Sequence, residues 1–383
     1  MKKKTKKGKG FLKALAILLA VVIVFTGVAI TLTAVGNKAN TEKVNSFAAV
    51  EKEDTLVPEK DENGRWTFTT DRDFKVLQLT DIHIGAGFMC QKKDAMALNA
   101  VASMVTAEKP DLVVITGDIA YPVPFQAGTI NNLNAAELFA ALMEKLGVYW
   151  TMTYGNHDTE SYSKYSREDL DKFYTSDELK YCLYESDSED VDGYGNNVIN
   201  IKNSKGVITQ SLFMFDSHSY VDGDVLGLMW KYDNIHENQV NWYKETVLSL
   251  NEENQKVIDE LGPKEKSDIK SLAFFHIPLV EQKDAWYEYA ENGFKDTENV
   301  KLHYGVAGEG KKVVYSGIGE DNLFETMLEL DSTKGVFCGH DHYNNFSIDY
   351  KGIRLTYGMS VDYLAYPGIY KEGSQRGCTM ITC

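Results

Sequence analysis

Cysteine is sparse in this chain and follows no pattern. The five cysteines among 383 residues include no Cys-x-x-Cys pair, so the sequence carries no dense disulfide framework. Their odd number leaves at least one thiol free or paired elsewhere. A bridge between Cys378 and Cys383 is one alternative, but small buried or surface thiols are the favoured interpretation for all five.

Positive charge is missing from most of the chain. Seven of the 40 basic residues fall within residues 1–13, which contain no acidic residue. The remaining 33 basic residues stand against 56 acidic ones, which gives a formal charge of −23. Because a body this acidic repels nucleic-acid phosphates, we expect no broad nucleic-acid binding.

The sequence also lacks internal repeats, a phosphate-binding P-loop and the Gly-x-Ser-x-Gly motif of serine hydrolases. What is present is a globular composition, with 43% hydrophobic and 25% charged residues. The length suffices for one large domain or two ordinary ones.

The longest hydrophobic run lies near the N-terminus. Residues 14–35 hold no charged side chain and follow a lysine-rich segment. A helix needs about 20 apolar residues to cross a bilayer, whereas the apolar part of a cleaved secretory signal has about 7–15. The length therefore predicts a retained signal anchor. The excess of lysines before the span predicts a cytoplasmic N-terminus and an extracellular remainder. Secretion after signal cleavage is the alternative.

The chain accordingly divides into four parts. Residues 1–10 are expected to form a basic cytoplasmic tail, 11–35 the transmembrane signal anchor, and 36–65 a polar, charged linker. Residues 66–383 are expected to form the folded domain, which begins near Trp66.

Apolar strands and helices alternate in the first part of that domain. Strands are expected over 74–80, 111–117 and 148–155, with helices over 94–108 and 134–146 between them. Asp94 is a candidate cap for the first helix, Pro110 lies just past its end, and Gly147 stops the second helix. This alternation predicts an α/β fold with a largely parallel sheet covered by helices.

The rest of the domain is less regular. Residues 160–196 are expected to form loops with short helices, and 282–315 are expected to be irregular. The remaining expected elements are strands over 197–202, 207–216, 269–278 and 335–338, helices over 237–250 and 320–329, and a hairpin through Lys351-Gly352.

Polar residues follow the apolar strands where each strand ends. The strand ends read Asp81-Ile82-His83, Gly117-Asp118, Gly155-Asn156-His157-Asp158, His276-Ile277-Pro278 and Gly339-His340-Asp341-His342. Each motif alone is explained equally well by a turn or a structural histidine, but five in succession are not. Ligands bind at the carboxyl edge of an open α/β sheet. Buried carboxylates converging there repel one another unless a cation lies among them, so the pattern predicts a metal centre.

The residue types narrow the choice of metal. Imidazoles mixed with carboxylates and an amide oxygen suit Mn, Fe, Zn, Co or Ni rather than Ca. The candidate ligands exceed what one ion with open positions needs, whereas two ions about 3.5–4 Å apart would use them all. Such a pair requires a bridging carboxylate and a bridging water or hydroxide.

Taken in order, the five motifs resemble those of the calcineurin-like metallophosphoesterase superfamily, spread over residues 81–342. The stretches GYGNNVIN, FMFDSHSY, KYDNIHENQVNWY, FFHIPLVE and GVFCGHDHYNNF further resemble its purple-acid-phosphatase-related branch. The resemblance implies layered β-sheets flanked by α-helices and makes residues 66–383 the catalytic domain.

The resemblance also implies a role for each residue. Seven side chains would hold two metal ions, Mn, Fe or Zn: Asp81, His83 and His342 the first, Asn156, His276 and His340 the second, and Asp118 both. His157 would face the phosphate and protonate or hydrogen-bond the leaving oxygen. Asp158 would orient His157 by accepting its other N–H.

Other candidates are expected to have structural or peripheral roles. Tyr121 has the Gly-Asp-x-x-Tyr spacing of the iron-binding tyrosine in true purple acid phosphatases. His83 takes the place of that ligand in the wider family, so Tyr121 is expected to be a pocket or structural residue. His218 and His236 are expected at the pocket rim and His303 at the surface. Five tyrosines are interpreted as ordinary loop aromatics rather than as a stack for a sugar or base: Tyr162, Tyr165, Tyr174, Tyr181 and Tyr184.

The sequence thus predicts a membrane-anchored phosphoesterase that depends on two metal ions. A metal-bridging hydroxide would attack phosphorus in line, and His157 would assist departure of the alcohol. The motifs do not separate phosphomonoesters from phosphodiesters. The alternatives are a catalytically silent, membrane-tethered binding module that retains the fold and a redox di-metal protein.

Overall fold

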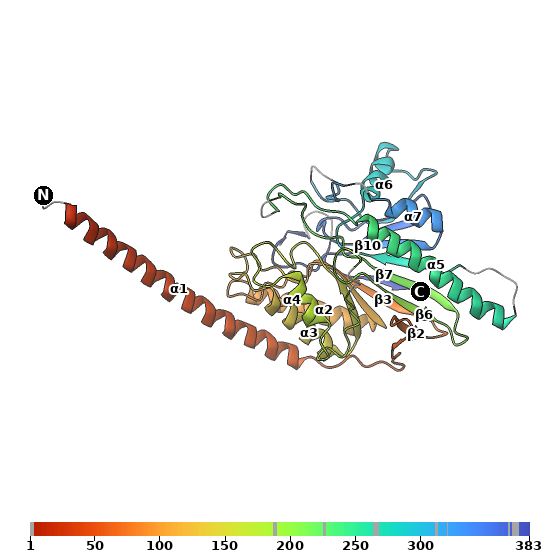
Figure 1. The fold of residues 1–383 in the computed structure, drawn as a ribbon, viewed down its shortest axis with the longest axis horizontal. Coiled ribbons are helices and arrows are strands. Elements are labelled where there is room, and N and C mark those ends of the chain that lie inside the picture. The colour runs from red at the N-terminus through yellow and green to blue at the C-terminus, as the bar shows by residue number, and fades with distance from the viewer. Residues whose placement is uncertain are drawn as a thin grey trace.

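A long N-terminal helix leads into a layered α/β domain (Figure 1). The computed structural model describes residues 4–186, 190–224, 227–262, 268–310, 313–319, 321–366, 368–369 and 375–383. Helix α1 spans Lys4–Ser46. The first three residues of the expected basic tail, and residue 320 of an expected helix, lie outside the described residues.

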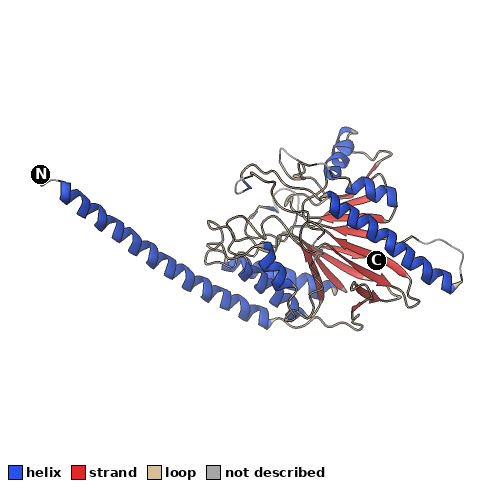
Figure 2. Cartoon of the chain, viewed as in Figure 1, coloured by secondary structure: helices blue, strands red, loops and turns tan. Residues whose placement is uncertain are grey.

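Two β-sheets pack against each other at the centre of the domain (Figure 2). The smaller sheet has the order β13-β3-β4-β5. Its strands are Thr379–Thr382, Lys75–Leu79, Leu112–Thr116 and Tyr149–Thr153. The larger sheet has the order β1-β2-β6-β7-β8-β10-β12-β11-β9. Its strands are, in chain order, Glu59–Lys60, Trp66–Thr69, Asn197–Lys202, Ile208–Met214, Ser271–Phe274, Val300–Tyr304, Thr333–Cys338, Ser347–Tyr350 and Ile353–Tyr357.

Helices cover the outer face of each sheet. Apolar residues of α2 (Gln91–Glu108) and α3 (Leu133–Leu146) form one core with the smaller sheet, while α5 (Glu237–Leu261), α6 (Val280–Glu291) and α7 (Leu323–Leu330) form another with the larger sheet. A third core lies between the sheets and includes Val114, Leu212 and Phe274. The expected layered fold is therefore confirmed.

The expected parallel strands are present in the smaller sheet. Strands β3, β4 and β5 are parallel neighbours, and α2 and α3 connect them as expected. The larger sheet, to which that alternation of strands and helices did not extend, mixes parallel and antiparallel pairs because hairpins such as β11–β12 are built into it. That hairpin turns at Lys351 and Gly352, whose φ values of 48° and 92° suit a two-residue type I′ turn.

Three local expectations are wrong. Asp94 does not cap α2, because the helix begins at Gln91 and the buried Asp94 carboxylate instead accepts the N–H groups of Gly85 and Ala86. Helix α5 continues to Leu261 rather than ending near 250. The segment 282–315 contains most of α6 and all of β9, and α6 escaped detection because it buries few side chains, among them Gln282.

The expected linker is not a free tether. Helix α1 continues past Val35 to Ser46, and its side chains Asn40 and Val44 are buried against the domain. Beyond the helix, the N–H of Val50 donates to the carbonyl of Leu146 at 2.8 Å. The residues that make these contacts are scattered through an otherwise polar stretch. Their irregular spacing does not predict a buried face. The four-part division of the chain stays a prediction.

An ion pair buried near the carboxyl edge of the sheets fixes the 160–196 segment. Arg167, at the start of α4 (Arg167–Tyr174), pairs with Asp216 at the end of β7. Its other guanidinium nitrogen donates to the carbonyl of His218 at 3.0 Å. Asp216 is fully buried, and burial by itself raises the pKa of its carboxyl. The Arg167 guanidinium outweighs that effect and holds this pKa below its usual range.

Arg167→Met should therefore destabilise the domain by about 3–5 kcal/mol, because it leaves a buried carboxylate without its partner. Urea unfolding measures the loss. Lys172→Met is the matched control, since Lys172 lies on the same helix in an exposed pair with Glu168 and should change stability little. Equal effects of the two substitutions would contradict the assigned role of Arg167.

Candidate metal centre

Five strands from both sheets bring the predicted residues to one edge. Asp81 and His83 follow β3, Asp118 follows β4, and Asn156 follows β5 in the smaller sheet. The other three follow strands of the larger sheet: His276 after β8, and His340 and His342 after β10. All seven side chains are buried. The structure thus gathers the whole predicted set where the two sheets meet.

The backbone turns sharply at these strand ends. Asp81, His83, Asp118 and His340 all have left-handed backbone, with φ of 51°, 53°, 57° and 75°. Positive φ is uncommon outside glycine, and such residues concentrate at functional sites because the surrounding structure must hold them there. Four of the seven candidate ligands have this backbone conformation, which is unfavourable locally. Packing and hydrogen bonds of the surrounding fold must therefore hold these side chains in place.

Two glycines permit the loops to approach closely. A Cβ on Gly155 would lie 2.1 Å from Asp118 Oδ1 and 2.5 Å from the Asp118 backbone nitrogen. A Cβ on Gly339 would lie 1.9 Å from Thr80 Oγ1. The glycines that precede Asn156 and His340 in the sequence motifs therefore have a steric role.

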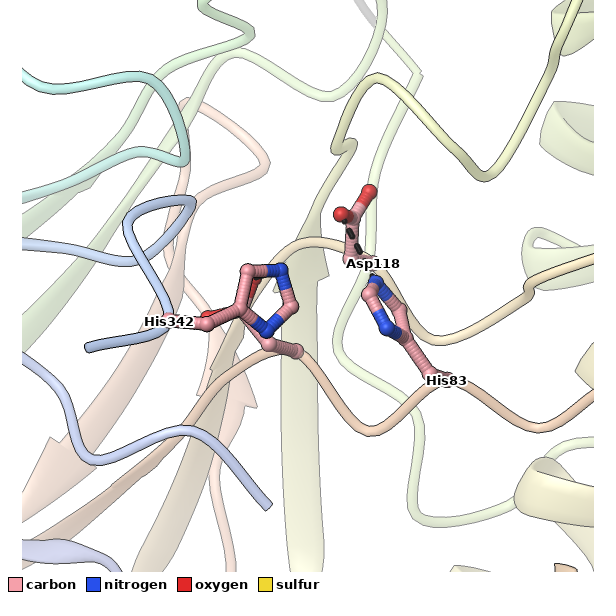
Figure 3. Close-up of side chains that lie close together, drawn as sticks. His83, Asp118 and His342 are labelled. Atoms are coloured by element: carbon pink, nitrogen blue, oxygen red, sulfur yellow. Dashed lines mark hydrogen bonds and ion pairs between the residues drawn. The ribbon is translucent and has the colours of Figure 1, made fainter. Parts of the chain in front are cut away.

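Asp118 lies at the centre of the group. Its Oδ2 is 3.0 Å from Nε2 of His83 and 3.3 Å from Nε2 of His276, and its Oδ1 accepts the N–H of His157 at 2.8 Å. Figure 3 shows the His83 ring directed at this carboxylate, with His342 arriving from another segment. One carboxylate oxygen therefore faces imidazole nitrogens of both expected metal sets, which is the placement a bridging ligand requires.

The first set is compact. Asp81, His83, Asp118 and His342 each offer one ligand atom, and these atoms all lie within 4.8 Å of one another. Nε2 of His342 is 3.6 Å from Oδ1 of Asp81. Carboxylate oxygens and imidazole nitrogens at this spacing suit a transition-metal ion.

The second set directs a ring nitrogen and two oxygens at one point. Nδ1 of His276 lies 2.8 Å from the carbonyl of Thr116 and donates its proton there, which turns Nε2 toward the centre. That Nε2 lies 3.2 Å from Oδ1 of Asn156, whose amide nitrogen donates to Tyr220, and 3.3 Å from Oδ2 of Asp118. Burial lowers the pKa of His276, but the carboxylates of Asp118 and Asp81 outweigh that effect and raise it to about 9, so this place favours positive charge, which either a proton or a metal ion can supply. The ring of His340 is 5.1 Å from that of His276 and completes the set.

Asp362 is a residue that the sequence analysis missed. Its carboxylate lies 3.4 Å from Nδ1 of His83 and 3.7 Å from Nδ1 of His342, and the N–H groups of Leu364 and Ala365 hold it in place. Burial lowers the pKa of His83, but the carboxylates of Asp362 and Asp118 together outweigh that effect and raise it to about 10. Asp362 thus favours a His83 ring with Nε2 toward the centre, while Ser360, whose Oγ lies 3.1 Å from Nδ1 of His342, orients the second ring in the same way. The only sequence signal was its place just past β12, whose end neighbours the end of β10.

The role expected for Asp158 is wrong. Its buried carboxylate accepts the N–H groups of Asp118, Ala120 and Gly155 at 2.8–2.9 Å, so it joins the loops after β4 and β5. The partner of His157 is Glu160, whose Oε1 lies 2.6 Å from Nδ1. His157 and Asp158 are consecutive residues whose side chains point to opposite sides of the loop. His157 points toward the cavity, and Asp158 points inward to backbone N–H groups.

A cavity of about 260 Å³ opens beside the centre. His157, His340 and His342 line it together with aromatic residues, Trp230, Tyr232, Tyr315 and Tyr366. Tyr121 packs against both His83 and His157, with ring centroids 4.6 and 4.8 Å apart. Burial raises the pKa of its phenol, which fits the expected pocket residue.

The remaining histidines and tyrosines have other partners. His218 and His236 stack on each other 4.0 Å apart and do not line this cavity. His236 faces Asp192 at 2.7 Å and Asp233 at 3.3 Å, and Nε2 of His218 lies 2.8 Å from Oε1 of Gln239, so both rings have protein partners. His303 pairs with Asp349. Tyr174 and Tyr184 are buried around Tyr154, as expected for structural aromatics.

All five cysteines carry free thiols, including Cys378 and Cys383. Cys90, Cys182 and Cys338 are buried, and burial raises the pKa of each thiol. The cysteines therefore contribute neither a disulfide nor a ligand to the centre.

Comparison with known proteins gives consistent matches. The family model described as calcineurin-like phosphoesterase matches residues 74–344. From Arabidopsis thaliana, "Probable inactive purple acid phosphatase 14" is 30% identical over 78% of this chain and 73% of its own length, and "Probable inactive purple acid phosphatase 28" is 27% identical over the same shares. "Phosphatase DCR2" of Saccharomyces cerevisiae is 28% identical over 73% of this chain and 46% of its own length.

Asp362→Asn should weaken metal binding about 10–100-fold, because loss of a carboxylate that orients ligand histidines typically costs that much affinity. Titration with Mn²⁺ or Zn²⁺, followed by calorimetry, measures the change. Asp349→Asn is the control, since that carboxylate pairs with His303 away from the centre. Unchanged affinity in the Asp362 variant would show that the rings are positioned without it.

Proposed function

The chain belongs to the calcineurin-like phosphoesterase family, and from this premise we propose that it is a membrane-anchored phosphoesterase that depends on two metal ions. The observation that carries the proposal is the convergence of seven buried side chains, with Asp118 at their centre and carboxylate oxygens and imidazole nitrogens close together. Asp81, His83 and His342 would hold the first ion, Asn156, His276 and His340 the second, and Asp118 both.

Two bound cations of this kind offset the charge that develops on phosphoryl oxygens and lower the pKa of a water between them. The chain itself supplies the geometry for that chemistry. Asp362 and the Thr116 carbonyl fix the imidazoles, and Asp158 fixes the loop that carries Asp118. Mn, Fe and Zn all suit this donor set.

His157 is placed to act on the leaving group. Its ring borders the cavity, and Nδ1 faces Glu160, so Nε2 is left to contact a substrate in the cavity. Glu160 holds the ring in that orientation, with Nε2 free to donate a proton to a departing alcohol. Glu160 therefore replaces Asp158 as the proposed positioning residue.

The cavity indicates the chemical character of the substrate's organic group. Phosphomonoesters and phosphodiesters both fit a pocket of this volume beside two metal ions. Trp230, Tyr232 and Tyr366 offer apolar surface to the organic part of the ester. The organic group is thus expected to carry an apolar or planar portion.

A catalytically silent module is the second candidate. The names of the two Arabidopsis relatives describe them as probably inactive, so family membership alone does not imply hydrolysis. The complete ligand set and the His157–Glu160 pair favour catalysis in this chain. A redox role has no comparable support.

The proposed location is a cell membrane, with the domain on the outer side. Residues 10–46 of α1 form one helix that is long and apolar enough to span a bilayer. Its lysine-rich start favours a cytoplasmic N-terminus.

Removal of metal should abolish hydrolysis of phosphate esters, and Mn²⁺, Zn²⁺ or Fe²⁺ should restore it. A panel of phosphomonoesters and phosphodiesters measures both steps. Asp118→Asn should not recover, because it removes the negative charge that joins both sites. Full activity without metal would refute the proposal, and two bound ions without activity on any ester would favour the silent module.

His157→Asn should lower kcat about 10²–10⁴-fold on esters of poor leaving groups, the usual loss for a general acid, and much less on nitrophenyl esters. Both metals should stay bound. Glu160→Gln should show the same leaving-group pattern with a smaller loss. Glu168→Gln, an exposed neighbour on α4, is the control. Loss of a metal ion from the His157 variant, or an equal loss of activity on good and poor leaving groups, would show that His157 does not act on the leaving group.

A further inference from the structure

Two loops that carry the metal centre also present apolar side chains to solvent. The loop between β3 and α2 includes Phe88 and Met89, and the loop between β4 and α3 includes Phe125 and Ile130. Phe125 is 89% exposed and Met89 is 53% exposed. Exposed large apolar groups gathered at one place mark an interaction surface rather than ordinary surface residues.

These loops lie against the N-terminal helix. The ring of Phe25 is 6.3 Å from that of Phe88. The side chain of Gln91 donates to the carbonyl of Leu32, and that of Asn37 donates to the carbonyl of Ala86. Polar contacts therefore set the helix beside the loops, and the apolar contact lies closer to its N-terminal part.

A groove of about 890 Å³ separates the helix from the loops. One wall is the uncharged segment of α1, including Phe25 and Ile30, and the other includes Phe88, Met89 and Phe125. The lining also contains the amides of Asn131 and Asn134 and the exposed cation Lys164. Apolar walls with a cation and amide donors match a molecule that has a hydrocarbon chain and a phosphate headgroup.

The length of the helix places the groove at the level of the membrane surface. The uncharged segment 14–35 is about as long as the 20 residues that cross the hydrocarbon core, so the outer boundary falls near Val35. At 1.5 Å per residue, Ile30, which lines the groove, then lies about 8 Å below that boundary. Apolar faces of interfacial segments are buried to about 5–10 Å. The groove, which extends along α1 from Phe25 to Asn37, therefore reaches from the hydrocarbon core to the level of the headgroups.

We propose that the loops 85–90 and 121–132, together with α1, form a lipid-binding face whose groove takes a phospholipid of the outer leaflet. The inference rests on the proposed membrane anchor. A soluble partner does not fit, because one wall of the groove is the segment that would lie in the bilayer. A small apolar cluster of Cys90, Tyr121, Ala127 and Leu364 joins this face to the wall of the metal centre. The centre therefore lies close to the lipid headgroups.

The test uses the full chain in phosphatidylcholine vesicles whose acyl chains are brominated. Phe125→Trp should add fluorescence that these lipids quench and that aqueous acrylamide does not reach. Phe294→Trp is the matched control, because Phe294 is 62% exposed and follows α6, far from α1 (Figure 1). Its added fluorescence should be quenched by acrylamide and not by the lipid. The same behaviour at both positions would overturn the proposal.

A second measurement separates this inference from the proposed function. Alkaline carbonate should leave the wild-type protein in the vesicle fraction, and its release would mean that the anchor itself fails. Retention without lipid quenching at position 125 would refute the lipid-binding face alone. Neither readout depends on hydrolysis, so an inactive protein can pass both and an active one can fail both.

Discussion

The architecture depends on one buried carboxylate, Asp118. Its backbone carbonyl accepts the N–H groups of Ile82 and His83, its own N–H donates to Asp158, and its side chain faces His83 and His276. The loops after β3, β5 and β8 therefore all contact Asp118, which itself lies in the loop after β4. Burial opposes its ionisation, but His276 and His157 outweigh that effect and hold its pKa well below its usual range. A charge kept ionised at the junction of two sheets fixes how those sheets can meet.

That junction explains the layered fold. Neither sheet alone carries all seven residues: the smaller supplies Asp81, His83, Asp118 and Asn156, and the larger supplies three histidines. Cross-sheet hydrogen bonds keep the two edges in register, among them Gln78 Nε2 to the carbonyl of Cys338 at 3.0 Å. The apolar core between the sheets gives the packing energy, and these polar contacts set the alignment that the centre needs.

The residues that gather at the centre could be predicted from the sequence because each lies at or just past the end of an apolar strand. Their assignment to two metal ions came from the family resemblance and stays a proposal. The sequence did not predict side-chain direction, and so it assigned to Asp158 the contact that Glu160 makes. Asp362 escaped because its loop neighbours the centre only through the β10–β12 pairing, which no local signal records. Likewise, Val44 meets α3 only after the whole chain is folded, so the linker looked free in the sequence. A strand can be predicted from its own residues, whereas a contact between two loops depends on how distant parts of the chain fold together.

The energetics of the centre bear on whether the protein is an enzyme. Asp81 and Asp118 are both buried, and burial together with the Asp118 charge raises the pKa of Asp81 to about 6. Replacing buried charged groups by packed apolar side chains is often neutral or stabilising, so a module that used only the fold gains nothing from them. Left-handed backbone at four candidate ligands adds a further local cost. Bound cations would offset both costs, and under the proposed function the His157–Glu160 pair would then act on the leaving group of an ester in the cavity.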